Sequence, residues 1–166
     1  IMDAVRMVSP DVVVCLSTTG RKTTDFSKRI ACLDTNPPPQ MASLSAGSFN
    51  FRDDVTVNDP KTIYAFLSAM KERGIKPEME IFDLGMARAT ARLMKEGWLS
   101  TPVYANVILG NNDTASDSLI DVAALHQYLP EELIWCAGGI GRNQQRSNIL
   151  GMLYGHGVRI GIEDNP

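Results

Sequence analysis

The chain has 166 residues, of which 44% are hydrophobic and 21% are charged. These proportions are typical of one globular domain and exclude a mainly disordered chain. Only 16 Lys and Arg residues stand against 19 Asp and Glu, and the isoelectric point is about 5.3. The chain therefore has no basic field to neutralise a phosphate backbone, and we do not expect it to bind nucleic acid.

The apolar runs are short. Val12–Leu16, one of the longest, falls far below the ~20 residues that cross a bilayer, and no signal segment opens the chain. The cysteines, Cys15, Cys32 and Cys136, are widely spaced and form no C-x-x-C, so they indicate neither a disulfide framework nor a cysteine-based zinc site. We expect a cytoplasmic protein that does not bind membranes.

Short apolar runs rich in β-branched residues alternate with longer stretches of helical period, which is typical of βα units around a parallel sheet. The near-continuous apolarity of these runs predicts strands buried on both faces. The expected strands are Val12–Leu16, Met41–Leu44, Met79–Phe82, Val103–Leu109, Leu133–Cys136 and Val158–Ile162.

The clearest helix follows the second strand. Asp59 is its expected N-cap, Pro60 suits the first helical position, and Gly74 closes it. Further helices are expected at about Ile1–Val8, Asp25–Leu33, Met86–Glu96, Asp117–Tyr128 and Asn143–Tyr154. This α/β pattern fits a doubly wound sheet or a (β/α) barrel, and periodicity does not choose between them.

The strongest local signal for a site lies at the end of the last expected strand. Glu163 and Asp164 are adjacent carboxylates that repel each other and lose hydration there, so they call for a metal, a cation or a reaction to serve. Arg159 and Gly161 share the side-chain parity of Glu163, while Asp164 starts on the other face. The alternative is an acidic turn on the surface.

Other candidates lie in or after the earlier strands. Glu80 sits mid-strand among apolar residues, which favours a site over a salt-bridged structural residue. We expect Glu78, near the strand entrance, to be solvated. Hydroxyl groups and glycines in Ser17–Gly20 and Ser43–Phe51 are suited to binding small anions such as carboxylates, although such residues also form ordinary loops.

A glycine-rich turn and two histidines complete the candidates. Gly139-x-Gly141 lacks the third glycine of the dinucleotide fingerprint, because Gln144 takes its place, but a phosphate cradle ahead of a helix stays open. His126 and His156 stand far in sequence from other ligand-type residues, and we interpret both as structural.

In this order, the segments resemble the β-keto acid cleavage enzymes. The resemblance runs over the whole chain, through Val12–Gly20, Ala42–Phe51, Pro77–Asp83, Gly139–Arg142 and Arg159–Asn165. It implies a (β/α)8 TIM barrel, of which residues 1–166 would be a single partial domain covering about the third to eighth strands, cut at both ends. The implied reaction uses zinc and converts a β-keto acid and acetyl-CoA to acetoacetate and a new CoA thioester.

The resemblance also implies roles for particular residues. Glu163 would be a zinc ligand and Asp164 the general base, assisted by Arg159, while Ser17 and Glu80 would position and protonate the reacting carbonyl groups. Since barrel active sites assemble at the carboxyl ends of strands, these groups should meet at one end of the sheet. The implied substrate-binding residues are Ser43, Ser45 and Gly47, which would grip the substrate carboxylate, and Thr18.

The chain also departs from the family pattern. The family's other two zinc ligands form a His-x-His pair, which this chain does not contain. Thr19 stands where glycine is frequent, and Ser43 and Ser45 stand where threonine and asparagine are frequent. Two alternatives therefore stay open, a structural barrel fragment without a metal centre and another metal-dependent barrel lyase. We expect the full-length form to be a homo-oligomer.

Overall fold

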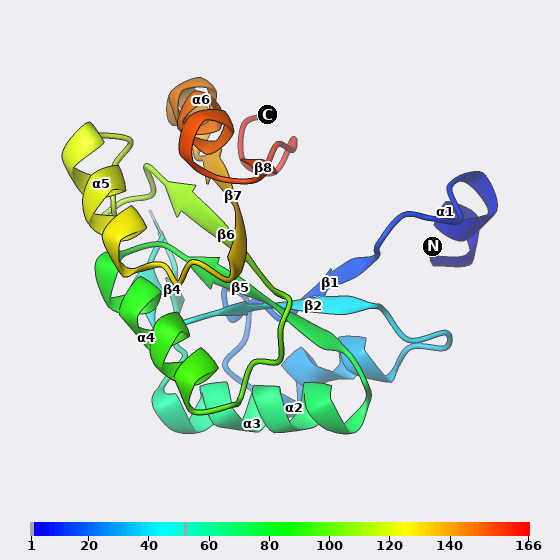
Figure 1. The fold of residues 1–166 in the computed structure, drawn as a ribbon. Coiled ribbons are helices and arrows are strands. Elements are labelled where there is room, and N and C mark those ends of the chain that lie inside the picture. The colour runs from blue at the N-terminus through cyan, green and yellow to red at the C-terminus, as the bar shows by residue number, and fades with distance from the viewer. Residues whose placement is uncertain (1, 52) are drawn as a thin grey trace.

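The computed structural model describes residues 2–51 and 53–166, which form an α/β fold around a six-stranded parallel sheet (Figure 1). The strand order is β1-β2-β5-β6-β7-β8, so the strands follow one another across the sheet as they do along the chain. A doubly wound sheet would reverse this order at a switch point. The strands are β1 (Cys15–Ser17), β2 (Met41–Ser45), β5 (Lys76–Ile81), β6 (Val103–Leu109), β7 (Leu133–Gly139) and β8 (Gly157–Val158).

The crossovers are helical, as expected. The helices are α1 (Met2–Val8), α2 (Phe26–Ile30), α3 (Pro60–Glu72), α4 (Leu84–Lys95), α5 (Leu119–Tyr128) and α6 (Gln144–Tyr154), with 3-10 turns at Ala31–Asp34 and Gly141–Asn143. The predicted cap of α3 is confirmed, because the Asp59 carboxylate accepts a hydrogen bond from the backbone N–H of Thr62 at 2.7 Å. Figure 1 shows α1 standing apart from the sheet.

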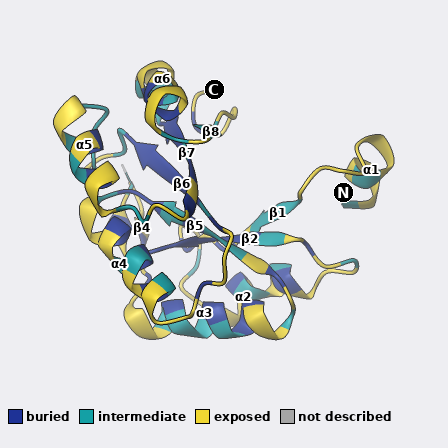
Figure 2. Ribbon diagram, in the orientation of Figure 1, coloured by how far each residue is buried: buried dark blue, intermediate teal, exposed yellow. Residues whose placement is uncertain are grey.

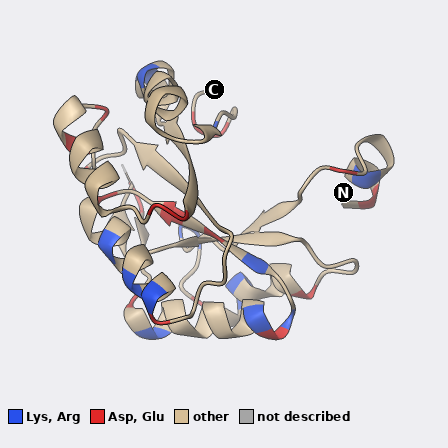
Figure 3. Cartoon of the chain, in the orientation of Figure 1, with Lys and Arg blue, Asp and Glu red and all other residues tan. Residues whose placement is uncertain are grey.

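The two faces of the sheet differ in chemistry. The helix-facing side carries apolar residues such as Leu44, Met79, Val107 and Ala137, all buried (Figure 2). Residues in register on parallel strands project from the same face, and on the other face these rows are polar. One row is Ser17, Ser43, Glu78 and Tyr104, and the next is Ser45, Glu80, Asn106 and Cys136. Figure 3 shows acidic residues, coloured red, within the sheet at β5.

The two outermost strands are shorter than the sequence predicts. Val12 and Val13 lie outside β1 and are 40% and 58% exposed, and beyond β8 the side chains of Ile160 and Ile162 are 69% and 88% exposed. The prediction of a buried strand over Val158–Ile162 is therefore wrong. The physical reason is that β1 and β8 lie at the two edges of the sheet. Each pairs with a single neighbour, so no strand covers its outer side.

A small antiparallel hairpin, which sequence reasoning missed, follows β2. It consists of β3 (Phe49–Asn50) and β4 (Val55–Thr56), and it lies beyond the carboxyl end of β2. The Phe49 ring stacks on Phe82 at a centroid distance of 3.9 Å, which anchors the hairpin to the end of β5.

Across residues 2–51 and 53–166, no helix has the length and apolarity needed to span a membrane.

Candidate active site

Arg159 lies among four carboxylates on the polar side of the sheet. Its Nε atom is 2.9 Å from Asp164 Oδ2, and its Nη2 atom is 3.3 Å from Glu163 Oε1. Its Nη1 atom is 3.8 Å from Glu80 Oε1 and 4.0 Å from Glu78 Oε1. Burial of the guanidinium disfavours its charge, but the hydrogen bond to Asp164 and the surrounding carboxylates outweigh this and raise the pKa of Arg159. Arg159 therefore stays charged.

The adjacent carboxylates Glu163 and Asp164 have different environments. The side chain of Glu163 is 78% exposed, whereas that of Asp164 is 6% exposed. After β8 the chain turns, with the N–H groups of Asp164 and Asn165 both bonded to the Gly161 carbonyl, and this turn brings Asp164 back onto Arg159. Strand parity predicted Glu163 on the face of Arg159 and Asp164 on the other, but the turn makes Asp164 the closer partner.

Gly138 provides the space that the Arg159 side chain occupies. A Cβ atom at Gly138 would lie 3.0 Å from Arg159 Cβ and 3.2 Å from Arg159 Cγ, which is closer than such atoms normally approach. These atoms belong to the base of the side chain, so they cannot move aside without shifting the backbone. The glycine in β7 therefore sets where the arginine lies.

We expect Gly138→Ala to lower the free energy of unfolding of the full-length protein by about 1–3 kcal/mol, because it overpacks this contact. Gly161→Ala is the matched control, since a Cβ atom there would meet no heavy atom within 4 Å. Urea unfolding of both variants measures the difference. Equal losses of stability in the two variants would contradict the proposed contact.

Glu80 is held from the neighbouring strand. Ser45 Oγ donates a hydrogen bond to Glu80 Oε2 at 2.7 Å, and the Glu80 side chain is 18% exposed. Burial raises the pKa of Glu80; the Ser45 hydrogen bond and Arg159 oppose this rise, while Glu78 and Glu163 add to it. A carboxyl group with a raised pKa retains a proton that it can donate to a carbonyl oxygen.

The raised pKa of Glu80 predicts a pH dependence of stability. The folded state binds this proton more tightly than the unfolded state, so the stabilising contribution is complete below the ordinary glutamate pKa and is lost as the pH rises through the folded value. Glu80→Gln cannot titrate. We therefore expect this variant to lose less stability than the wild type between pH 4.5 and neutral pH, measured by urea unfolding across that range. If Glu80→Gln loses as much stability as the wild type over this pH range, the pH dependence of stability comes from another group.

The remaining predicted residues lie on or near the same polar face. Ser17 is exposed and pairs in register with buried Ser43. Thr18 is 2% exposed, and its hydroxyl donates a hydrogen bond to the Ser43 carbonyl at 2.5 Å. This geometry favours a structural contact, and the role of Thr18 in substrate binding stays a prediction. A Cβ atom at Gly47 would lie 3.3 Å from Met86 Cγ, so this glycine packs against α4.

Sequence reasoning missed three residues of the site. The expectation that Glu78 is solvated is wrong, because its side chain is only 12% exposed and faces Arg159. Tyr104 and Asn106 lie beside it, and the Tyr104 hydroxyl donates to Asn106 Oδ1 at 3.1 Å. Together with Arg159 and Asp164 these residues line a pocket of about 490 Å³. The sequence did carry a signal for two of them: Tyr104 and Asn106 are two residues apart in an otherwise apolar strand, so their side chains face the same side of the sheet.

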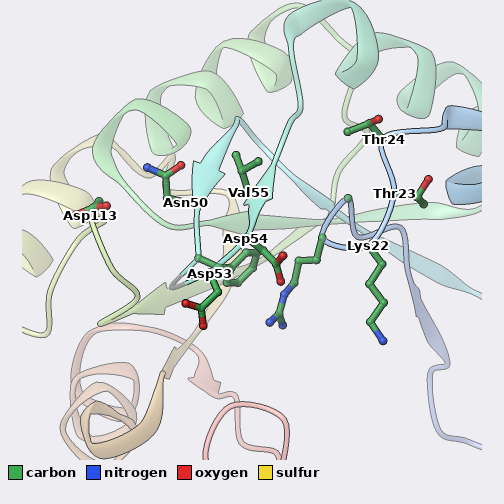
Figure 4. Close-up of a pocket in the computed structure, with 11 residues that line it drawn as sticks. Lys22, Thr23, Thr24, Asn50, Asp53, Asp54, Val55 and Asp113 are labelled. Atoms are coloured by element: carbon green, nitrogen blue, oxygen red, sulfur yellow. The ribbon is translucent and has the colours of Figure 1, made fainter.

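A larger pocket of about 780 Å³ lies away from this cluster (Figure 4). Its lining comes from the loop after β1, the β3–β4 hairpin and the loop after β6, and includes Lys22, Asp53, Asp54 and Asp113. The Arg21 guanidinium lies 4.2 Å above the Phe51 ring. We place the candidate active site at the smaller pocket, because Glu78, Arg159 and Asp164 line it. Glu80 lies next to this lining, 3.8 Å from Arg159.

The glycine-rich turn and the histidines have structural contacts. The backbone N–H of Gly141 donates to the Asp164 carbonyl at 2.7 Å, so it fixes the end of the chain and is not free for a phosphate. His156 Nδ1 accepts from the backbone N–H of Trp135 at 3.3 Å, and the His126 ring packs edge-on against Trp135. These contacts agree with the structural interpretation of both histidines.

The described residues do not by themselves fit a zinc ion. Within 2–51 and 53–166 no three His, Cys, Asp or Glu side chains are placed to hold a metal, and a catalytic zinc ordinarily takes three protein ligands. Glu163, the predicted ligand, faces Arg159 and solvent.

A parallel α/β sheet with a half-buried arginine among carboxylates at one face defines an enzyme-like site. Comparison with known proteins gives the family of the chain. Residues 1–166 match the model of the beta-keto acid cleavage enzyme family, and the chain belongs to that family. The resemblance drawn from the sequence is therefore confirmed.

Characterised relatives agree with this assignment. The chain is 35% identical over 165 residues to 3-keto-5-aminohexanoate cleavage enzyme of Fusobacterium nucleatum, covering 99% of the chain and 59% of that protein. It is 29% identical over 168 residues to 3-oxoadipate:acetyl-CoA acetyltransferase of Cupriavidus necator, covering 99% of the chain and 58% of that protein. The chain thus spans about three fifths of these relatives.

A solved structure is similar in fold. The apo structure of ObcA superimposes with a TM-score of 0.79 at 18% sequence identity, over 97% of this chain and 43% of ObcA. This likeness concerns the fold alone.

Proposed function

We propose that the protein transfers acyl groups between β-keto acids and coenzyme A. A β-keto acid and acetyl-CoA would give acetoacetate and a new acyl-CoA thioester, so that the C–C bond broken in one acid is matched by the one formed in the other. The observation that carries this proposal is the cluster in which Arg159 holds buried Asp164 at 2.9 Å while lying 3.8 Å from Glu80.

The cluster supports a division of roles. Asp164 would take the proton from the carbon between the two carbonyl groups of the β-keto acid, and Arg159 would hold this base in position. Glu80, whose pKa is raised by burial, would donate a hydrogen bond or a proton to the reacting carbonyl, and Ser17, at the end of β1, would help to position that carbonyl. Ser43, Ser45 and Gly47 would grip the substrate carboxylate.

We also propose that the sheet is part of a (β/α)8 barrel. Sequential parallel strands with crossover helices packed on one face are what a barrel of this kind requires. The polar face would then line the barrel interior. The six strands would correspond to the third to eighth of the barrel.

In this proposal Glu163 is the one residue that we expect to bind zinc. In a family enzyme the metal would polarise a keto oxygen and stabilise enolate charge. The exposed Glu163 carboxylate is the one candidate ligand that we identify, so we assign no step to the metal.

The test is an assay of the full-length protein with acetyl-CoA and a panel of β-keto acids bearing terminal amino, carboxylate or neutral groups, with and without added Zn²⁺. We expect acetoacetate and a new thioester, detected by mass spectrometry, from at least one acid. Cleavage without coenzyme A would favour the lyase alternative. No product with any acid in metal-replete buffer would favour a structural role and contradict the proposal.

A further inference from the structure

Arg29, on α2, is a buried cation outside the cluster of Arg159. It is 5% exposed, and among the described residues no carboxylate lies within 4.0 Å of it. One face of the guanidinium lies 4.7 Å from the centre of the Phe66 ring. Gly20 packs closely as well, since a Cβ atom there would lie 3.3 Å from Arg29 Cζ. Burying a charge without a counter-charge is costly, so a reason beyond stability is needed.

The guanidinium joins three separate segments by hydrogen bonds. Its Nε atom donates to the Thr18 carbonyl at 3.0 Å, just beyond β1. Its Nη1 atom donates to the Val57 carbonyl at 3.2 Å, after β4, and its Nη2 atom donates to Asn58 Oδ1 at 2.7 Å. The planar fork of arginine can satisfy three such acceptors at once, whereas a lysine ammonium cannot match the same geometry.

Asn58 carries the connection to the site. Its Nδ2 atom donates to the Ser45 carbonyl at 2.9 Å, and the hydroxyl of the same Ser45 donates to Glu80. Asn58 is itself 3% exposed, and its backbone N–H donates to Ser48 Oγ at 2.8 Å. An unbroken chain of hydrogen bonds therefore runs from Arg29 through Asn58 and Ser45 to Glu80.

We propose that Arg29 is a positioning residue, which through Asn58 fixes the carboxyl end of β2 so that the Ser45 hydroxyl holds Glu80 for reaction. The same guanidinium fixes the end of β1 through Thr18, so both strand ends are set by one buried group. This inference deepens the proposed function and rests on it where activity is measured. It assigns to Arg29 no contact with substrate.

Asn58→Asp is the decisive variant. Aspartate still accepts from Arg29, and its charge pairs with the guanidinium, but it has no N–H to donate to the Ser45 carbonyl. We expect a Tm in the full-length protein at or above that of the wild type, while kcat falls by about 10–100-fold, the cost of a displaced reacting group. If Asn58→Asp does not fold, Arg29→Lys serves the same test, because it keeps the charge and loses the fork.

Arg73→Lys is the matched control. Arg73 Nε bonds Asp34 Oδ1 at 2.7 Å on the surface, and its hydrogen bonds go to Asp34 and Ala69, not to the residues that hold Glu80. We expect its kcat to equal that of the wild type. A kcat for Asn58→Asp equal to the wild type, or a loss that only follows a lower Tm, would overturn the proposal.

A second readout needs no activity. The titration of Glu80, followed by NMR of ¹³C-labelled glutamate carboxyl groups and assigned with Glu80→Gln, should move to higher pH in Arg29→Lys, which leaves the net charge unchanged, because the Ser45 hydrogen bond opposes protonation. The other groups that face Glu80 are Cys15, Glu78, Arg159 and Glu163, and none of them is altered. An unmoved midpoint would overturn the positioning role. An inactive wild type with a moved midpoint would overturn only the proposed function.

Discussion

Replacing Asp164 by Asn in the full-length protein is expected to lower turnover with acetyl-CoA by about 10²–10⁴-fold, the usual cost of losing a general base. Asparagine has the same shape and still offers an oxygen to Arg159, so the fold should persist. The change removes proton-accepting ability from a side chain that is 6% exposed and bonded to Arg159 at 2.9 Å. Steady-state rates and zinc content, measured on the same sample, check this.

Glu163→Gln is the matched control, because it neutralises the adjacent carboxylate. We expect this variant to lose zinc as well as turnover, whereas Asp164→Asn should keep its zinc content nearly unchanged. Near-normal turnover in Asp164→Asn, or loss of zinc as complete as in Glu163→Gln, would mean that the two carboxylates divide the work differently.

Arg159→Met should have the largest effect on stability. The guanidinium side chain is 20% exposed and lies within 4.0 Å of four carboxylates. Removing it leaves Asp164 buried without its cation, and breaking a buried pair in this way costs about 3–5 kcal/mol. Turnover should fall as in Asp164→Asn, because Asp164 loses the cation that holds it in position.

The pH dependence makes this second prediction specific. Burial raises the pKa of Glu80, and a proton on Glu80 removes part of the repulsion that Arg159→Met leaves uncompensated, so the deficit in free energy of unfolding should be smaller at pH 5 than at pH 8. Arg92→Met is the control, because Arg92 pairs with Glu96 on the surface at 3.0 Å and such pairs contribute little. A deficit independent of pH would indicate lost packing, with the charge of Arg159 of little consequence.

The sequence by itself determined the presence of the helices and the central strands. One helix, α3, begins where local capping predicts, at Asp59 and Pro60, because a cap is a contact between residues three apart. The central strands β2, β5, β6 and β7 followed from apolar runs. Glu80, Asp164 and Arg159 could be proposed as site residues because charged side chains in or after an apolar strand are visible in the chain itself; their roles stay predictions.

Only the tertiary structure decided how these side chains meet. The turn after β8 placed Asp164 nearer to Arg159 than Glu163, against strand parity. Sheet register brought Glu78 to Arg159, from a position more than 80 residues earlier in the printed sequence. Arg29 reached Asn58, and through it Ser45, across loops that carry no periodic signal. Such contacts depend on where whole strands and loops pack. A local sequence pattern predicts only the interactions between residues that are close in the chain.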